Sequence, residues 1–426
     1  MICTVSCEDA GGKTGKTGEP HDYVSELKLD MSSETLKQEV TVKLYVDGDT
    51  THFHVPKSVI DTEVLKARYI AINTPESTGK IEEYGKTASN FTREKLSSAV
   101  SIILETDGNT WEPDSTGSRY LVWVWYKTSE NEDYRNLNLE ILQNGLAIAS
   151  STANNRYGEI CTAALAQARE QKLNIYSGQK DPNFYYGEAQ ELTLKELRCN
   201  IADYSGVKVA FEGVITMGSN NSVYVEEYDA ETDMYYGISI YYGYGLSGEG
   251  LNVLSIGNRA RIVGTVQYYE AGGTYQVSGL SYRAMRPDDP NNIKKISSGN
   301  AAAYRETDPA TFAYGKVDVD MGDEIVKFDY SALAMSTSVS MSGLQVISAY
   351  TTLDEESSSY GALTLFCEAD GVPVQVRTVI LFDDNGNVIK DEAYIGKNIN
   401  VKGLVDFYDG TYQIKVFSAK DITIND

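Results

Sequence analysis

The sequence is poor in positive charge, and this limits how it can bind nucleic acid. Its 426 residues include 37 Lys and Arg against 61 Asp and Glu, which gives a formal net charge of −24 at pH 7. Proteins that hold nucleic acid mainly by releasing phosphate counterions are usually basic. The composition therefore excludes a broadly electrostatic nucleic-acid binder, and any contact with a polyanion has to be local or mediated by a metal.

Closely spaced cysteine pairs and long apolar runs are also lacking. Cys161, Cys199 and Cys367 lie far apart and form no Cys-x-x-Cys spacing, which argues against a zinc site. We expect these three to be buried free thiols, as isolated cysteines usually are. Because no run of about 18 apolar residues occurs, the sequence predicts no transmembrane helix.

Residues 1–37 predict a flexible N-terminal tail. A polar stretch rich in Gly, Lys and Thr follows Cys7, as expected of a spacer. We hypothesise that Cys7 follows the end of a removed leader and carries a lipid or surface anchor, which would place the protein outside the cell or on its surface. Residues 11–17 imitate a phosphate-binding loop, but Ala10 stands where that motif needs its first glycine, and no strand precedes it.

Proline and phenylalanine are scarce, with 9 and 10 residues, whereas tyrosine and glycine are abundant, with 31 and 36. This composition favours short strands joined by tight turns. The chain is too long for one hydrophobic core. Its patterning predicts a unit of strands and helices at 38–178, two units of nearly all strand at 191–290 and 305–426, and linkers at 179–190 and 287–304.

The last two units share an internal repeat. Residues 257–277 read GNRARIVGTVQYYEAGGTYQV, and residues 396–414 read GKNINVKGLVDFYDGTYQI. The two-residue difference in length falls in the expected hairpin, where it costs least. The repeat indicates two copies of one fold, and its strand–glycine–strand–hairpin–strand order suits a five-stranded barrel of the OB class.

Five motifs follow one another in the first unit. They are Asp47-Gly48-Asp49-Thr50 at a strand end, Arg68 five residues before Asn73-Thr74-Pro75-Glu76, Tyr84-Gly85-Lys86-Thr87-Ala88 at a helix start, Asp114 to Arg119 before the strand 120–126, and a group at 140–147, 166–169 and 172–177.

These residue types suit phosphodiester hydrolysis. Asp49, Asn73 and Thr74 offer a carboxylate, an amide oxygen and a backbone carbonyl, which are hard ligands of the kind that Ca²⁺ prefers. Glu76 can activate or orient an attacking water. Arg68 and Arg119 can bind a phosphate with two hydrogen bonds each and stabilise its transition state.

In order and spacing, the motifs resemble the staphylococcal nuclease family, also called thermonuclease, over about a third of the chain. The resemblance implies an OB-type barrel with helices, a calcium-dependent endonuclease acting on DNA or RNA, and products with 3′-phosphates. It also implies residue roles: Asp49, Asn73 and Thr74 hold Ca²⁺, Glu76 is the general base, and Arg68 and Arg119 bind the phosphate.

The sequence departs from this family at three points. Asn73 stands where the family has Asp, which keeps an oxygen ligand but removes a charge, so calcium should bind more weakly. Ser118 separates Gly117 from Arg119, where the family has Gly followed directly by Arg. The tyrosines of the family's nucleotide pocket are unmatched, because Thr116 and residues 149–152 stand in their place.

Several patterns have a purely structural alternative. His52 and His54 alternate on one strand and lack an evident third ligand, so strand packing is favoured over a metal site. Residues 383–387 imitate a calcium loop, but the position of the glycine favours a hairpin. The tyrosines at 235–244 could stack on bases, but the low basic content of this segment favours packing.

We therefore expect a mainly β protein with three consecutive OB-type five-stranded barrels, the first with helices and catalytic. The other two would be accessory domains for capturing substrate, orienting it or attaching to a surface. The alternative is a catalytically weak or inactive nucleic-acid- or surface-binding protein that keeps the nuclease fold.

Overall fold

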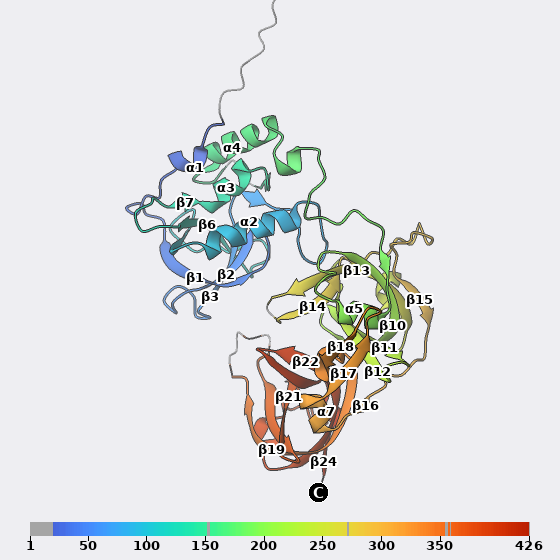
Figure 1. The fold of residues 1–426 in the computed structure, drawn as a ribbon. Coiled ribbons are helices and arrows are strands. Elements are labelled where there is room, and N and C mark those ends of the chain that lie inside the picture. Colours follow the sequence, from blue (N-terminus) through green and yellow to red (C-terminus); the bar gives the residue numbers. More distant parts are fainter. Residues whose placement is uncertain (1–19, 151–153, 271, 354–356, 358, 426) are drawn as a thin grey trace, which may run out of the picture.

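The computed structural model describes residues 20–150, 154–270, 272–353, 357 and 359–425. Cys3, Cys7 and the segment 11–17 lie outside these ranges. Three five-stranded barrels follow one another along the chain, coloured blue, green to yellow, and orange to red in Figure 1. None of the helices in the described ranges has the length and apolarity needed to cross a membrane.

The first barrel runs in the order β3-β2-β1-β5-β6 and closes through parallel pairing of β3 with β6. Its strands are β1 (Lys37–Tyr45), β2 (Thr50–His54), β3 (Val64–Tyr69), β5 (Ser101–Glu105) and β6 (Tyr120–Lys127). The remaining elements of this unit are the helices α1 (Tyr23–Glu26), α2 (Gly85–Ser97), α3 (Leu137–Gln143) and α4 (Gly158–Glu170), and the short strands β4 (Ile72–Asn73), β7 (Arg135–Asn136) and β8 (Ile148–Ala149).

The second barrel consists of β10 (Lys208–Ser219), β11 (Ser222–Asp229), β12 (Met234–Tyr241), β13 (Arg259–Tyr269) and β14 (Thr274–Ser278). The third consists of β19 (Ser338–Thr351), β20 (Ala362–Ala369), β21 (Val372–Ile380), β22 (Asn398–Tyr408) and β23 (Thr411–Val416). In all three barrels the first strand pairs with the second and fourth, and the third pairs in parallel with the fifth. This shared topology confirms the OB-type fold predicted from the sequence.

Smaller elements flank the second and third barrels. They are β9 (Gln190–Glu191), α5 (Leu194–Cys199), α6 (Glu249–Val253), β15 (Lys294–Ser297), β16 (Arg305–Glu306), α7 (Pro309–Tyr314), β17 (Lys316–Asp320), β18 (Ile325–Asp329), α8 (Tyr330–Leu333) and β24 (Ile422–Asn425).

The sequence repeat corresponds to the fourth and fifth strands of the second and third barrels. Val266 pairs with Val277 in one barrel, and Val405 pairs with Ile414 in the other. A Cβ atom at Gly264 or Gly403 would overlap the neighbouring strand, at the carbonyl of Ser278 and of Lys415 respectively. Both barrels therefore keep glycine here because the fifth strand passes too close for any side chain.

The structure differs from the predicted organisation in three segments. Residues 20–36, assigned to the flexible tail, include α1, and its Val24 is buried in the core of the first unit. In the predicted linker 179–190, the buried carboxylate of Asp181 accepts hydrogen bonds from the Tyr84 backbone (2.7 Å) and the Thr87 hydroxyl (2.6 Å) at the start of α2. In the predicted linker 287–304, β15 pairs with β13.

The described cysteines are free thiols, as predicted. Cys161 and Cys367 are buried, whereas Cys199 is only half-buried. The core of the first unit is separate, and the cores of the second and third barrels form one continuous apolar cluster. Where these two barrels meet, Glu226 of β11 accepts hydrogen bonds from the backbone (2.6 Å) and hydroxyl (2.8 Å) of Ser338 on β19.

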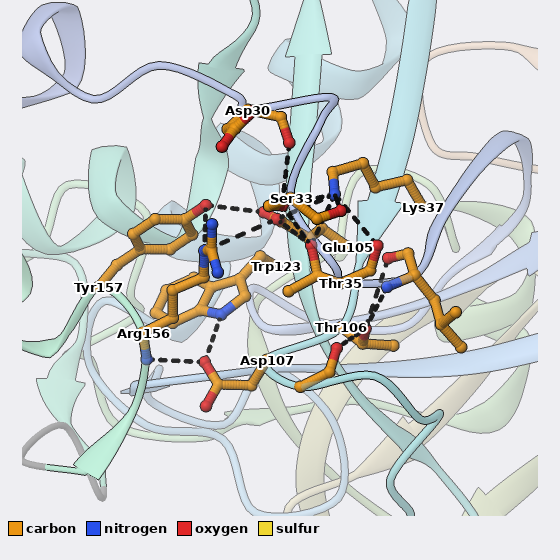
Figure 2. A network of polar contacts seen from close by, with 12 residues as sticks. Asp30, Ser33, Thr35, Lys37, Glu105, Thr106, Asp107, Trp123, Arg156 and Tyr157 are labelled. Carbon is orange, nitrogen blue, oxygen red and sulfur yellow. Dashed lines mark hydrogen bonds and ion pairs between the residues drawn. The ribbon is translucent and has the colours of Figure 1, made fainter.

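A buried carboxylate ties the N-terminal lead-in and α4 to the first barrel (Figure 2). Glu105 at the end of β5 is fully buried and accepts hydrogen bonds from Thr35 (2.7 Å), Trp125 (2.8 Å) and Tyr157 (3.0 Å). Lys37 lies 3.7 Å away and balances its charge. Three segments that are distant in sequence therefore converge on one side chain.

We expect Glu105→Ala to destabilise the first unit by about 3–5 kcal/mol, because it leaves buried donors without their acceptor and the buried charge of Lys37 without its counter-ion. All three tryptophans, Trp111, Trp123 and Trp125, belong to this unit, so the tryptophan fluorescence of a denaturant titration reports its free energy of unfolding. Glu130→Ala, at an exposed residue bonded to Lys127, is the control and should change little. Equal effects of the two substitutions would contradict the role given to Glu105.

Candidate active site

The turn between β1 and β2 is buried rather than a surface loop. Asp49 is 1% exposed, and its backbone N–H donates to the carboxylate of Asp47 (3.1 Å). A Cβ atom at Gly48 would lie 2.8 Å from Thr74 and 2.9 Å from Ala88. Glycine thus allows α2 and the loop after β4 to pack on this turn.

Arg68 brings two of the predicted metal ligands together. It lies on β3 opposite Thr50 of β2, and its side chain is largely buried. One guanidinium nitrogen pairs with the carboxylate of Asp49, and the other donates to the amide oxygen of Asn73 on β4. Since one planar guanidinium bonds both, these two oxygens lie within a few ångströms of each other.

The loop after β4 carries the next two predicted residues. The backbone N–H of Thr74 donates to the second carboxylate oxygen of Asp49 (2.8 Å). Two residues later, the backbone N–H of Glu76 donates to the carboxylate of Glu82 (3.2 Å), and the backbone N–H of Glu82 donates to the carbonyl of Glu76 (2.9 Å). A side chain at Gly85, the first residue of α2, would overlap the Glu76 carbonyl. The helix therefore begins directly against this loop.

Arg119 reaches the site through the closure of the barrel. It directly precedes β6, which pairs with β3 so that Leu121 lies opposite Arg68. Its guanidinium donates to the nearly buried carboxylate of Asp114 through Nε (2.8 Å) and Nη2 (2.6 Å). The loop that contains the extra Ser118 thus still presents Arg119 at the start of the strand.

Electrostatics also connect these groups. Partial burial and the negative charge of Asp49 raise the pKa of Glu76, while Arg68 and Arg119 oppose that rise. Burial and the charge of Asp49 raise the pKa of Asp47 to about 7. The pKa of the Glu76 carboxyl is therefore influenced by both Arg68 and Arg119, which lie 51 positions apart in the sequence. Such an influence is expected if the three side chains belong to a single site.

The candidate metal ligands are oxygen atoms, which calcium prefers, but Asp49 is the one charged ligand among them. Asp49, Asn73 and Thr74 lie together, and both side-chain ligands are bonded to Arg68. In the described ranges, no group of three or more His, Cys, Asp or Glu side chains is arranged to hold a metal ion. A calcium ion would rely on one strong carboxylate, with amide, carbonyl and water oxygens completing its coordination.

Two acidic residues of the site were not assigned roles from the sequence. Asp47 adds a second buried carboxyl beside Asp49, and Asp114 holds Arg119. Both belong to motifs that sequence reasoning had found, but only their burial and partners give them these roles. Thr116, which replaces an expected tyrosine, donates to Asp114 (2.6 Å), and residues 151–152 lie outside the described ranges.

Gly85→Ala should lower the free energy of unfolding of the first unit by about 1–3 kcal/mol, because the added methyl group displaces either α2 or the Glu76 loop. Gly108→Ala is the matched control, since no atom lies within 4 Å of its Cβ position. Tryptophan fluorescence during chemical denaturation measures both. If Gly85→Ala were as stable as the control, the tight packing between α2 and Glu76 would be disproved.

Comparison with known proteins identifies the family of the first unit. The family described as "Staphylococcal nuclease homologue" matches residues 66–178. The chain is also similar to the thermonuclease of Staphylococcus intermedius, with 30% identity over 149 residues, which cover 34% of this chain and 80% of that protein. The protein therefore belongs to the staphylococcal nuclease family, and the nuclease-like unit is its first barrel with the associated helices.

Proposed function

We propose that this protein is a calcium-dependent endonuclease that hydrolyses phosphodiester bonds of DNA or RNA. One observation carries the proposal: closure of the first barrel brings Arg68 into contact with Asp49 and Asn73 and pairs β3 with the strand that Arg119 directly precedes, while Glu76 follows Asn73 on the adjoining loop. The relative that it resembles is a thermonuclease.

Each residue has a role that its chemistry allows. Arg68 uses two of its N–H groups on Asp49 and Asn73, so others remain for a phosphate oxygen. Arg119 is about one-third exposed and approaches the phosphate from the β6 side. Although partly desolvated, the side chain of Glu76 is accessible to solvent on its loop, where its carboxylate can accept a proton from an attacking water.

Calcium bound by Asp49, Asn73 and the Thr74 carbonyl would neutralise charge on the phosphate. With Asn73 in place of a carboxylate, we expect its affinity to be low, in the range that extracellular calcium levels can fill. We therefore place the activity outside the cell, which matches the hypothesis of an anchored or secreted protein.

Wild-type protein should cleave DNA or RNA at millimolar Ca²⁺ and lose the activity in EDTA. Glu76→Gln removes the base and Arg68→Ala removes a phosphate ligand, so each should reduce kcat/KM at least about 100-fold. Glu159→Gln and Arg286→Ala, at exposed positions outside the site, should leave it unchanged. Cleavage of labelled oligonucleotides measures all five proteins.

A second candidate is a binding protein that keeps the nuclease fold without the reaction. The bonds from Arg68 to both side-chain ligands favour it, because a metal has to compete with the guanidinium for them. The same assay separates the two proposals: the absence of cleavage of DNA and RNA at millimolar Ca²⁺ would reject the enzyme.

Asn73→Asp should bind calcium about 10-fold or more tightly than the wild type, since it restores a carboxylate to the ligand set. Asn131→Asp adds the same charge at an exposed loop position of the same unit and serves as its control. Isothermal titration calorimetry with CaCl₂ measures the affinity of each. Equal affinities of the two variants would show that Asn73 does not bind the metal.

A further inference from the structure

A cleft of about 2220 Å³ lies between the barrels and is lined by residues of all three units. Its wall in the first unit includes residues 77–81, which begin directly after Glu76. Two contacts hold this unit to the second barrel. Gln267 of β13 donates to the carbonyl of Ser77, and Arg93 of α2 pairs with Glu270. The wall of the cleft therefore includes the residue that directly follows Glu76 in the chain.

The second barrel presents the binding side of its fold to this cleft. OB-type barrels bind oligonucleotides and oligosaccharides on the face of strands two and three and on the loops that join strands one to two and four to five. In this barrel those loops join β10 to β11 and β13 to β14. Residues 219–222 of the first loop and residues 269, 270, 272 and 274 of the second line the cleft, as do Tyr224 of β11 and Tyr241 of β12. The third barrel contributes Arg377 of its own third strand.

Exposed tyrosines gather in the cleft. Tyr244 is 93% exposed, Tyr268 50% and Tyr269 48%, and the third barrel adds the exposed Tyr350 and Tyr408. The low basic content of the segment 235–244 favoured packing for its tyrosines, and Tyr236 is indeed fully buried. Packing does not account for Tyr244, whose ring is almost entirely open to solvent.

The lining of the cleft, unlike the chain as a whole, holds more basic than acidic side chains. In the first two units the basic ones are Lys80, Lys86, Arg93, Lys208 and Arg283, and the acidic one is Glu270. Arg93 pairs with Glu270, Lys80 with Glu82 and Arg283 with Asp289, which leaves Lys86 and Lys208 as the basic side chains that a phosphate can contact without displacing a carboxylate. The whole chain carries −24. Low basic content, which had argued against base stacking, is therefore not true of this surface.

We propose that the cleft binds single-stranded nucleic acid and leads it to Glu76. Exposed tyrosine rings would stack on unpaired bases while the basic side chains contact the phosphates, the combination that single-strand binders use. Duplex bases are already stacked and cannot use the rings, so the protein selects single strands. Positive charge favours this ligand over a neutral oligosaccharide. The inference rests on the proposed nuclease function, whose substrate it names.

The test measures binding apart from cleavage. The full chain carrying Glu76→Gln is titrated in EDTA into a fluorescein-labelled oligothymidylate, a labelled duplex and a chitooligosaccharide, and anisotropy is recorded. We expect binding of the single strand at least about 10-fold tighter than of the duplex. Tyr244→Ala in this background should weaken single-strand binding at least about fivefold, the effect of one lost stacking contact.

Matched variants separate the cleft from the rest of the surface. Tyr314→Ala removes a tyrosine that is 65% exposed outside the cleft and should have no effect. Lys86→Ala, in the cleft, should reduce the slope of log Kd against log salt concentration by about 0.7, the value for one phosphate contact on a single strand. Lys294→Ala, exposed on β15 outside the cleft, should not.

The outcomes distinguish this inference from the nuclease proposal. Single-strand binding that depends on Tyr244 supports the cleft even if the wild type cleaves nothing. Cleavage by the wild type, with single-strand binding that is absent or insensitive to Tyr244→Ala, overturns the cleft and leaves the nuclease intact. Binding of the chitooligosaccharide in place of the oligothymidylate also overturns it.

Discussion

The parallel pairing of β3 with β6 is the constraint on which the candidate site depends. It closes the first barrel and places Arg68 opposite Leu121, so that Arg119 enters at the same end. The buried turn at Asp49 lies beside it because β2 pairs with β3. Arg68 is the penultimate residue of β3, and Asp49 and Arg119 directly precede β2 and β6, so the strand ladders fix the backbone at all three residues.

Within this frame, Arg68 acts as an internal counter-ion. In a protein with a charge of −24, the buried carboxylate of Asp49 needs a cation, and the guanidinium supplies it while also holding Asn73. A buried charge without a partner is costly. The same arrangement would weaken the proposed calcium site, since a calcium ion would have to displace a bonded arginine and would gain only one strong carboxylate in return.

The second and third barrels repeat one topology and share one apolar core. Because they share one apolar core, the two barrels should move less relative to each other than two domains joined by a flexible linker would. The contacts of Gln267 and Arg93 then set the first barrel beside this unit. Exposed tyrosines and basic residues from separate segments thus line one cleft, although each of the three units has more acidic than basic residues.

The sequence by itself determined the three barrels, the repeat and the order of the site motifs. Strand alternation, glycines at hairpins and the spacing from Asp49 to Arg119 are local patterns. Local patterns can be recognised in the sequence without knowledge of the tertiary structure. It did not indicate that Glu105 is a buried anchor, that Asp181 belongs to the start of α2, or that residues 20–36 are folded. Only the tertiary structure decided these points, and with them which tyrosines and basic side chains line the cleft, because burial and partners depend on residues tens to hundreds of positions apart.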